Sequence, residues 1–346
     1  MPWTMPAEAA PQDRVWMSFP VADSSYSAED GQDHEEARRV WAEVANAVNR
    51  FVPVSMLVDP AERAAASTIL DSSIELFEVP LDDCWLRDSG PTFVHAADGS
   101  VHAVDWIFNG WGQQDWARWD KDSKLGAFVG ERAGVPVIDS PLVNEGGGIV
   151  ADGNGTVVVT ETVQLDPFRN PDLDKAGIER ELADKIGARQ VVWLKRGLTR
   201  DSQRFGTRGH ADILVAFPAP DTVLVHTQRD PEHPDFEISR EIIETLDNAT
   251  DADGNPWRIV ELPAPEALRD DEGWVDYSYI NHLVVNGAVI ACSFADPNDD
   301  EALAILAAEY PGREIVSIDA RPVFARGGGI HCITQQQPSP LPGAED

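Results

Sequence analysis

One motif recurs along the chain, and its clearest copy is Gly153-Asn154-Gly155-Thr156-Val157-Val158-Val159-Thr160. In this copy a turn leads into an apolar run that is typical of a buried strand. Further copies lie at residues 220–226 and 286–292, with a looser one at 97–104. The equivalent positions Thr156, Thr222 and Ala288 follow one another at intervals of 66 residues. A period of this length predicts repeated supersecondary units.

Each copy is expected to be the second strand of a hairpin that is closed by a turn rich in Gly, Asn and Asp. The first strands of these hairpins are expected to begin near Asp88, Glu145, His210, Tyr279 and Gly328. The last of them would pair with an N-terminal strand at residues 15–19. Between copies the sequence predicts a helix and then a short strand, as at 175–186 and 190–194.

These repeats predict an α/β fold, a five-bladed, pseudo-symmetric α/β propeller of hairpin–helix–strand units. Five units fit the 346 residues at about 69 each. No linker interrupts the pattern, so residues 1–346 are interpreted as a single domain, with segments 1–13 and 338–346 peripheral. Joining the two chain ends in one sheet would remove exposed strand edges.

The composition is strongly acidic, with 60 acidic against 27 basic residues and a formal net charge of −33. This balance argues against nucleic acid and anionic membrane surfaces as partners. It favours a small cationic ligand, although a protein of a salty cytoplasm would show the same excess, so both interpretations stay open. Three widely spaced cysteines, no secretory signal and no run of about 18 apolar residues indicate a protein of the reducing cytoplasm.

Polar residues stand at the start of the inner hairpin in successive repeats. They are Asp88 in Arg-Asp-Ser-Gly-Pro, Glu145 in Asn-Glu-Gly-Gly-Gly, His210 and Asp212 in Arg-Gly-His-Ala-Asp, and Cys332 in Gly-Gly-Gly-Ile-His-Cys. Equivalent positions of a radial fold converge at one end of its axis. We therefore expect a thiol, an imidazole and three carboxylates in one pocket. The i, i+2 spacing of His210 and Asp212 would place both on one face of a strand.

This set of side chains suits nucleophilic attack on an electrophilic carbon, with Cys332 as nucleophile and His210 as general acid and base. The carboxylates of Asp88 and Asp212 match a planar, forked cation, because carboxylate–guanidinium pairing is bidentate and charge-assisted. The expected partner is therefore a small cationic guanidino compound. The three glycines before Ile330 would let the backbone bring the thiol close to its carbon.

Simpler roles are open to some of these residues. Asp88 could belong to an ordinary turn and Glu145 to a solvated loop. A metal site made of Glu145, His210 and Asp212 is disfavoured, because no second histidine lies at ligand spacing.

The neighbours of the candidate site carry their own expectations. His331 is expected to point to the opposite face of its strand from the thiol and to be structural. Cys84 and Cys292 lie outside the converging positions and are expected in the core. A loop with tryptophans at 106, 111, 116 and 119 could pack in the core or close over a cationic ligand through its ring faces.

An ordered set of short motifs resembles the agmatine deiminase family, which is part of the guanidino-group-modifying or pentein superfamily and is related to bacterial-type peptidylarginine deiminases. The motifs are Met5-Pro6-Ala7-Glu8, Trp85-Leu86-Arg87-Asp88-Ser89-Gly90-Pro91, Phe108-Asn109-Gly110-Trp111-Gly112, Glu145-Gly146-Gly147, Arg169-Asn170-Pro171, Gly209-His210-Ala211-Asp212, Tyr279-Ile280-Asn281 and Gly327-Gly328-Gly329-Ile330-His331-Cys332-Ile333-Thr334-Gln335-Gln336. Each piece alone is weak. The ordered set is specific and runs almost from end to end.

The resemblance implies five α/β blades and the hydrolysis of agmatine to N-carbamoylputrescine and ammonia, in polyamine and putrescine biosynthesis. It implies that Cys332 forms a covalent thiouronium intermediate, and that His210 protonates departing ammonia and then activates water. Asp88 and Asp212 would grip the guanidinium, and Glu145 would hold His210 or a substrate nitrogen. The family uses no metal or organic cofactor.

Trp85, Trp111, Gly329 and Arg208 complete the expected substrate-binding set. Relatives usually carry an acidic residue four positions before the catalytic histidine and Asn or Asp two before it, where this chain has Gly206 and Arg208. Arg208 could select a carboxylate-bearing guanidine such as arginine or a guanidino acid, or it could pair with a protein acid and leave agmatine preferred. An amidinotransferase and a catalytically silent binding propeller are the remaining alternatives, and monomer and homodimer both stay open.

Overall fold

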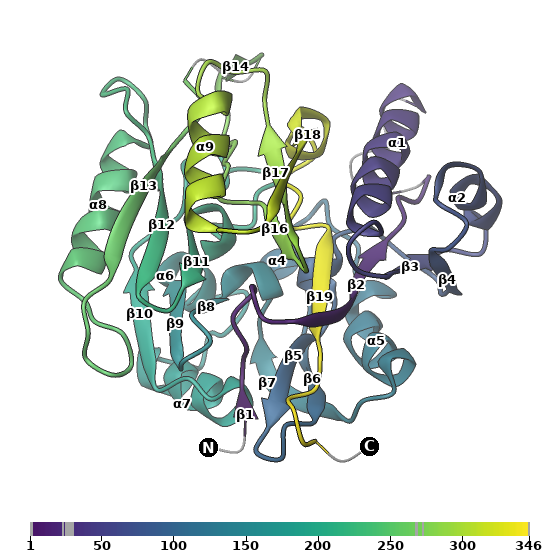
Figure 1. Cartoon of the computed structure of the whole chain (residues 1–346), viewed down its shortest axis with the longest axis horizontal. Helices are drawn as coiled ribbons and strands as arrows, with labels where there is room; N and C mark the ends of the chain where they lie inside the picture. Colours follow the sequence, from purple (N-terminus) through teal and green to yellow (C-terminus); the bar gives the residue numbers. More distant parts are fainter. Residues whose placement is uncertain (1–2, 23, 25–30, 267–268, 272, 345–346) are drawn as a thin grey trace.

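The described chain forms five sheets of three or four strands and one short two-stranded ribbon (Figure 1). This computed structural model describes residues 3–22, 24, 31–266, 269–271 and 273–344. In each of the five sheets, an inner strand runs antiparallel to a middle strand, and an outer strand runs parallel to the middle one. The mixed α/β fold predicted from the repeats is confirmed.

In the order inner, middle and outer strand, the five sheets are β5 (Thr92–Ala96), β6 (Val101–Ile107) and β7 (Val137–Val143); β8 (Val150–Ala151), β9 (Thr156–Thr160) and β10 (Gln190–Leu194); β11 (Val215–Ala219), β12 (Thr222–Thr227) and β13 (Arg258–Pro263); β16 (Leu283–Val285), β17 (Ala288–Ser293) and β18 (Glu314–Asp319); and β19 (Thr334–Pro338), β2 (Gln12–Ser18) and β3 (Val54–Val58). β1 (Trp3–Thr4) extends the first sheet along β5, and β4 (Glu75–Glu78) extends the last along β3. β14 (Arg269–Asp270) and β15 (Gly273–Trp274) form the ribbon.

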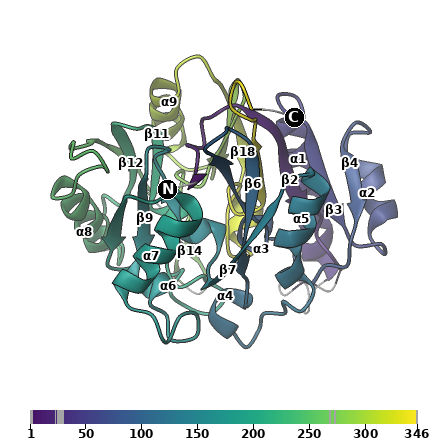
Figure 2. The ribbon, with the colours of Figure 1, turned by 90° about the horizontal axis from the view of Figure 1, so that it is seen from below.

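A long helix connects the middle strand of every sheet to its outer strand, as a parallel pair requires. These helices are α1 (Gly31–Val48), α5 (Leu125–Ala133), α7 (Lys175–Ile186), α8 (Phe236–Asp247) and α9 (Asp299–Glu309). Figures 1 and 2 show them around the outside of the molecule, with the sheets inside. The shorter helices are α2 (Arg63–Ile69), α3 (Leu86–Ser89), α4 (Gly110–Gln113), α6 (Glu161–Gln164) and α10 (Arg321–Phe324), with 3₁₀ turns η1 (Asp122–Lys124), η2 (Gly146–Gly148) and η3 (Ala211–Ile213).

The second sheet shows why the middle strands have continuous apolar sequences. Every residue of β9 is buried, because successive side chains enter different parts of the core. Val157 and Val159 join the cluster that contains the apolar face of α7, whereas Val158 joins the large central cluster. The α7 face consists of Ile178, Leu182 and Ile186, spaced four residues apart. Burial of each such side chain stabilises the fold by roughly 1.5–3 kcal/mol.

The two chain ends meet in one sheet, as the repeats predicted. β19 pairs antiparallel with β2, with Thr334 opposite Met17 and Gln336 opposite Val15. Figure 1 shows the yellow β19 beside the purple β2. This pairing supplies partners for strand edges that would otherwise be exposed.

Two local expectations were wrong. β19 begins at Thr334, so residues 330–333 form a turn, and Cys332 precedes the strand instead of lying on it. Asp212 lies in η3, so no strand alternation relates it to His210. Asp88 similarly lies in α3, ahead of β5. The polar residues of the repeats therefore lie on short turns, or directly before them, ahead of the inner strands.

The opening segment is less peripheral than expected. β1 pairs with β5, with Trp3 opposite Ala96. Farther along, Oε1 of Glu8 lies 2.6 Å from Nε2 of His331. The segment around Glu8 therefore reaches the centre of the molecule.

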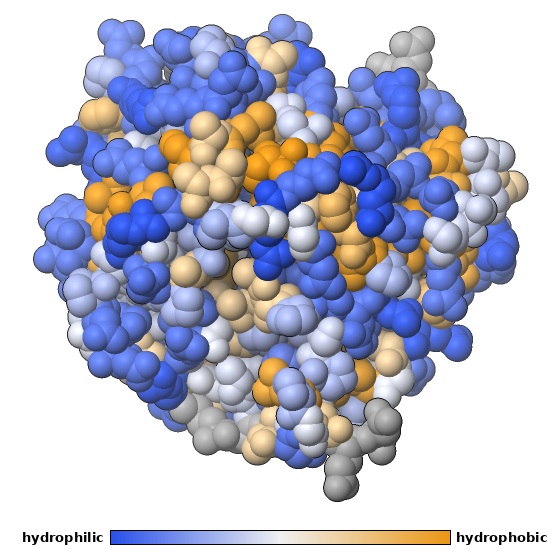
Figure 3. All heavy atoms as spheres, in the orientation of Figure 1, coloured by the Kyte–Doolittle hydropathy of each residue, from blue (hydrophilic) through white to orange (hydrophobic). Residues whose placement is uncertain are grey.

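The face seen in Figure 3 is mostly hydrophilic, with smaller apolar patches between the polar groups. The exposed large apolar side chains of the described residues are Ile69, Ile107, Phe168, Leu173, Phe205 and Leu341. Within the described ranges, none of the helices has both the length and the apolar character needed to cross a membrane.

Candidate active site

The five side chains expected to converge do meet, each placed by a turn at the start of an inner strand. Nε2 of His210 is 3.3 Å from Oε2 of Glu145, and its Nδ1 is 3.7 Å from Oδ1 of Asp88. Sγ of Cys332 is 3.6 Å from Oδ2 of Asp212. All five residues are buried. The period of the repeats thus predicted the meeting of these side chains, although it did not predict the turns that carry them.

A pocket reaches two members of this group. Its lining residues are Trp85, Asp88, Trp111, Trp116, Phe205, Thr207, Arg326, Gly327 and Cys332. The rings of Trp111 and Trp116 are stacked with centroids 5.3 Å apart, and Phe205 lies 5.4 Å from Trp116. Phe205 is 45% exposed and therefore lies at the rim. These rings form an apolar wall suited to an alkyl chain or to a cation over a ring face.

Cys332 is only 6% exposed. The side-chain amide of Asn281 donates to its Sγ over 3.3 Å. Burial, together with the negative charges of Asp212 and Asp88, raises the pKa of the Cys332 thiol well above its ordinary value. The protein alone therefore favours the protonated thiol, and a cation brought beside it would favour the thiolate.

His210 carries a positive charge at neutral pH. Burial lowers its pKa, but the charges of Asp88 and Glu145 and the hydrogen bond to Glu145 outweigh burial and raise the pKa to about 9. Gly147 allows this approach, because a Cβ at that position would lie 2.6 Å from Nδ1 of His210 and 2.9 Å from Oδ1 of Asp88. An imidazolium in this position can donate a proton to a departing nitrogen.

Glu145 is held by a buried guanidinium. Nε of Arg169 donates to both carboxylate oxygens of Glu145, over 2.9 and 3.1 Å. The other nitrogens of Arg169 donate to Asp166 over 2.9 Å and to the carbonyl of Thr207 over 2.8 Å. Burial would raise the pKa of Glu145, but Arg169 and His210 outweigh it and lower the pKa to about 2. Glu145 is thus a fixed, ionised partner for His210.

The two aspartates differ in their surroundings. Asp88 accepts hydrogen bonds from the indole N–H of Trp111 over 2.9 Å and from the backbone N–H of Gly147 over 3.1 Å. Burial, only partly offset by His210, raises the pKa of Asp88 to about 6. For Asp212, burial would raise the pKa, but the hydrogen bond and charge of His331, together with the charges of His210 and Arg87, outweigh burial and lower it. Oδ1 of Asp212 is buried and has no hydrogen-bond partner among the described residues, so it can accept one from a ligand.

Arg208 and Gly329, both expected to bind substrate, do not line the pocket. Nε of Arg208 is 3.2 Å from Oδ2 of Asp166, and its guanidinium lies 5.6 Å from the ring centroid of Phe168. This is the arrangement in which Arg208 pairs with a protein acid. A Cβ at Gly329 would come within 2.4 Å of Oδ1 of Asn281, so glycine permits close packing behind the thiol.

Sequence reasoning missed two residues that touch the group. Asn281 lies two residues after Tyr279, near the expected start of the fourth hairpin, and the short motif Tyr279-Ile280-Asn281 is the signal that could have identified it. The expectation that His331 points away was wrong, because Nδ1 of His331 is 2.7 Å from Oδ2 of Asp212. That expectation assumed strand alternation, and residues 330–333 form a turn.

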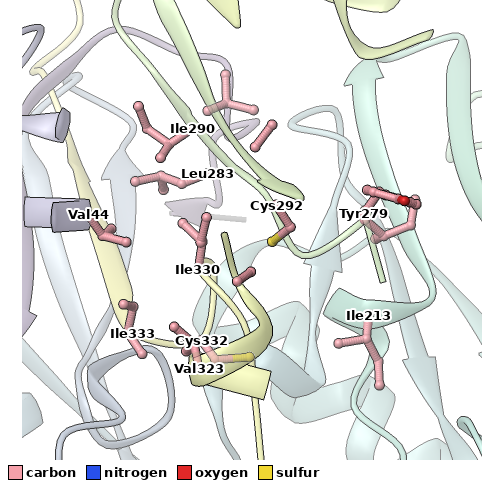
Figure 4. Close-up of a cluster of buried hydrophobic side chains, with 14 of the residues drawn as sticks. Val44, Ile213, Tyr279, Leu283, Ile290, Cys292, Val323, Ile330, Cys332 and Ile333 are labelled. Carbon is pink, nitrogen blue, oxygen red and sulfur yellow. The ribbon is translucent and has the colours of Figure 1, made fainter. Parts of the chain in front are cut away.

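Cys84 and Cys292 lie in the core, as expected. The thiol of Cys292 donates to the carbonyl of Asn281 over 3.2 Å, and burial raises its pKa to about 12. Figure 4 shows Cys292 near Ile330, and Cys332 elsewhere in the same apolar cluster. No set of three or more His, Cys, Asp or Glu in the described ranges is arranged to hold a metal ion.

Comparison with known proteins matches residues 4–338 to the Porphyromonas-type peptidyl-arginine deiminase family. A Streptomyces coelicolor protein provisionally named an agmatine deiminase is 50% identical over 98% of this chain and 99% of its own length. The agmatine deiminase of Pseudomonas fluorescens is 36% identical over 97% of this chain and 95% of its own. The solved structure of Enterococcus faecalis agmatine deiminase has a TM-score of 0.90 and 31% identity, and the match covers 97% of this chain and 96% of that one. The chain therefore belongs to the agmatine deiminase family, within the Porphyromonas-type peptidyl-arginine deiminases.

Proposed function

We propose that this chain hydrolyses agmatine to N-carbamoylputrescine and ammonia through a covalent intermediate on Cys332. The observation that carries the proposal is a buried thiol beside Asp212, with Asp88 in the lining of the same pocket and His210 behind it. The full-length relatives named as agmatine deiminases support the choice of substrate.

The guanidinium of the substrate is proposed to lie between Asp88 and Asp212. A guanidinium presents N–H donors in a planar fork, and carboxylates accept them with charge assistance. Oδ1 of Asp212 and Nδ1 of His210 are buried without hydrogen-bond partners among the described residues, so both remain available to a ligand. The bound cation offsets the negative charges that hold the Cys332 proton, so this proton passes to solvent water and the thiolate forms.

The first half-reaction forms a bond from Sγ of Cys332 to the guanidinium carbon. The electron pair of one C–N bond moves to nitrogen, the His210 imidazolium gives that nitrogen its proton, and ammonia leaves. In the second half-reaction neutral His210 takes a proton from water, and the hydroxide adds to the thiouronium carbon. The C–S bond then breaks with its electron pair returning to Sγ, and the new hydroxyl group gives its proton to solvent water. The neutral ureido product leaves, and Cys332 is a thiolate again. Each step uses a side chain, water or substrate, so no cofactor is part of the proposal.

The apolar wall of Trp111, Trp116 and Phe205 is proposed to accept the methylene chain. A second candidate substrate is arginine or a guanidino acid, because the pocket lining includes a cation, Arg326. Nη2 of Arg326 is 3.2 Å from Oε2 of Glu36, so this charge already has a carboxylate partner. We therefore prefer agmatine.

Ammonia release from agmatine, arginine and short guanidino acids, measured in parallel, tests the proposal. We expect saturable turnover of agmatine and its loss in Cys332→Ala. Turnover of arginine with none of agmatine would favour the second candidate. Agmatine turnover that persists in Cys332→Ala would exclude Cys332 as nucleophile. Amidino transfer to an added amine without ammonia release would indicate an amidinotransferase, and binding without turnover a silent propeller.

The proposal places the reaction in a reducing cytoplasm and in putrescine formation. Its chemistry needs Cys332 as a free thiol, and Cys332 forms no disulfide in the structure. A net charge of −33 disfavours nucleic acid and anionic membranes as partners. A homodimer stays a prediction, which light scattering of the purified chain would check.

A further inference from the structure

A second imidazole–carboxylate pair lies behind the reactive group. His331 is 4% exposed, and its Nδ1 is 2.7 Å from Oδ2 of Asp212. Its Nε2 is 2.6 Å from Oε1 of Glu8, whose side chain is 23% exposed. Arg87 contacts both members of the pair formed by His331 and Glu8. Its Nε donates to the His331 carbonyl over 3.3 Å, and its Nη1 is 3.8 Å from Oε1 of Glu8. The opening segment is thus linked through His331 to a carboxylate of the candidate active site.

The two carboxylate oxygens of Asp212 have different surroundings because of the contact with His331. Oδ2 receives the His331 hydrogen bond and lies near Sγ of Cys332. Oδ1 is buried and has no partner among the described residues. A donor at one oxygen fixes the rotamer of the carboxylate, so the other oxygen keeps a constant direction for a ligand.

The charges around His331 favour an ionised Asp212. An imidazole between two carboxylates donates from both nitrogens, which requires the imidazolium. Burial and Arg87 lower the pKa of His331, but Glu8 and Asp212 outweigh them and raise it. His282 and Tyr310 also lie nearby. Burial lowers the pKa of His282 to about 4 and raises the pKa of Tyr310, so neither adds a charge at neutral pH. Asp212 is also faced by His210, Arg87 and Asp88.

We propose that Glu8 and His331 act as a positioning pair, which holds Asp212 ionised and turned toward the substrate guanidinium. Glu8 orients His331, and His331 orients Asp212. The opening segment therefore contributes to substrate binding without touching the substrate. This inference rests on the proposed function, because it assigns Asp212 to the guanidinium.

Two isosteric changes at position 331 separate positioning from simple filling of space. The amide nitrogen of Asn replaces Nδ1 of the imidazole, so His331→Asn keeps a donor toward Asp212. The amide nitrogen of Gln replaces Nε2, so His331→Gln keeps the contact with Glu8 and loses that with Asp212. His331→Leu loses both. Glu8→Gln keeps an acceptor for His331 but removes the charge.

The measurements are KM and kcat for agmatine between pH 5 and 9, and the affinity of agmatine for each variant in a Cys332→Ala background. Loss of one hydrogen bond to a buried charge corresponds to roughly 10- to 100-fold. We expect His331→Leu and His331→Gln to raise KM by about that factor, to weaken binding in the Cys332→Ala background equally, and to move the acid limb of kcat/KM to higher pH. His331→Asn, which keeps a donor toward Asp212 but loses the contact with Glu8, and Glu8→Gln should both fall between these variants and the parent.

His282→Asn is the matched control. His282 lines the same cavity as Glu8, Asp212 and His331. Its Nδ1 is 2.9 Å from the Tyr279 carbonyl and its Nε2 is 2.9 Å from the Tyr310 hydroxyl. Both of its ring nitrogens are engaged by these tyrosines and not by Asp212, so this variant should lower Tm and leave KM and the acid limb unchanged.

Three outcomes would overturn the inference. The first is a folded His331→Leu protein with the KM and pH profile of the parent. The second is His331→Gln behaving like the parent while His331→Asn fails, and the third is His282→Asn shifting the acid limb equally. Failure of the proposed function looks different, because the unmodified chain would then not turn over agmatine at all.

Discussion

Trp111→Phe tests how the pocket keeps Asp88 ionised. The change removes the indole N–H that donates to Oδ2 of Asp88 over 2.9 Å and keeps a ring to pack against Trp116. The ionised form of Asp88 is the one that binds a guanidinium. A hydrogen bond to a buried charge contributes about 1.5–3 kcal/mol, and one pKa unit corresponds to about 1.4 kcal/mol.

The pKa of Asp88, which is about 6, should therefore rise by roughly 1–2 units in Trp111→Phe. A raised pKa means that more of the carboxyl is protonated at a given pH. At pH 7 the ionised fraction would fall from about 90% to between about 50% and 10%. We expect kcat/KM for agmatine to fall about 2- to 10-fold at pH 7, and the ratio to the parent to approach one near pH 9.

The assay is steady-state ammonia release from agmatine across pH 5 to 9. Trp106→Phe is the matched control, because the indole of Trp106 donates to Oγ1 of Thr92 over 2.8 Å and is equally buried. That variant loses a comparable hydrogen bond away from the carboxylates and should show no pH-dependent loss. A Trp111→Phe to parent ratio that does not change with pH would refute the reasoning.

Contacts within the site lead to three further predictions. Gly147→Ala should lower kcat/KM about 100-fold in steady-state kinetics. The new Cβ would lie 2.6 Å from Nδ1 of His210, so the imidazole would have to move. Arg169→Lys should lower the free energy of unfolding by about 1.5–3 kcal/mol in urea titrations, since a lysine ammonium cannot donate to Glu145, Asp166 and the Thr207 carbonyl together as this guanidinium does. The folded-state pKa of Glu145, about 2, is below its unfolded value, so its contribution is present above about pH 4.3 and is lost as pH falls toward 2. In Arg169→Lys that acid-dependent loss should be smaller. Cys332→Ala should abolish ammonia release yet still bind agmatine in calorimetry.

Matched controls exist for two of these variants. A Cβ at Gly148 would meet its nearest neighbour at 3.3 Å, so Gly148→Ala should retain most activity, and an equal loss in both variants would contradict the steric argument. Cys292→Ala removes a thiol from the core and should lower Tm while ammonia release persists. For Arg169→Lys, an unchanged urea midpoint would contradict the account of the buried pair.

The repeats and the meeting of the chain ends were predictable because their signals are local. Turn residues followed by apolar runs specify hairpins wherever they occur, and the 66-residue interval arranged them into equivalent units. The convergence of Asp88, Glu145, His210 and Cys332 then followed from equivalence alone.

The local geometry of the site was not predictable in the same way. Residues 330–333 contain a short apolar run that favours a strand. Hydrogen bonds from His331 N–H to Asn281 and from Arg87 N–H to the Cys332 carbonyl hold them instead as a turn before β19. The pairing of Arg169 with Glu145 joins residues 24 apart and has no periodic signal. The backbone of Trp111 has a positive φ of 54°. Residues with aliphatic or aromatic side chains rarely adopt this conformation, and no sequence pattern predicts it here.

The most direct test of the central claim is ammonia release from agmatine and from arginine by the unmodified chain, measured side by side. We expect saturable release from agmatine and little or none from arginine. Release from arginine with none from agmatine would contradict the substrate assignment, and release from neither would contradict the proposed reaction.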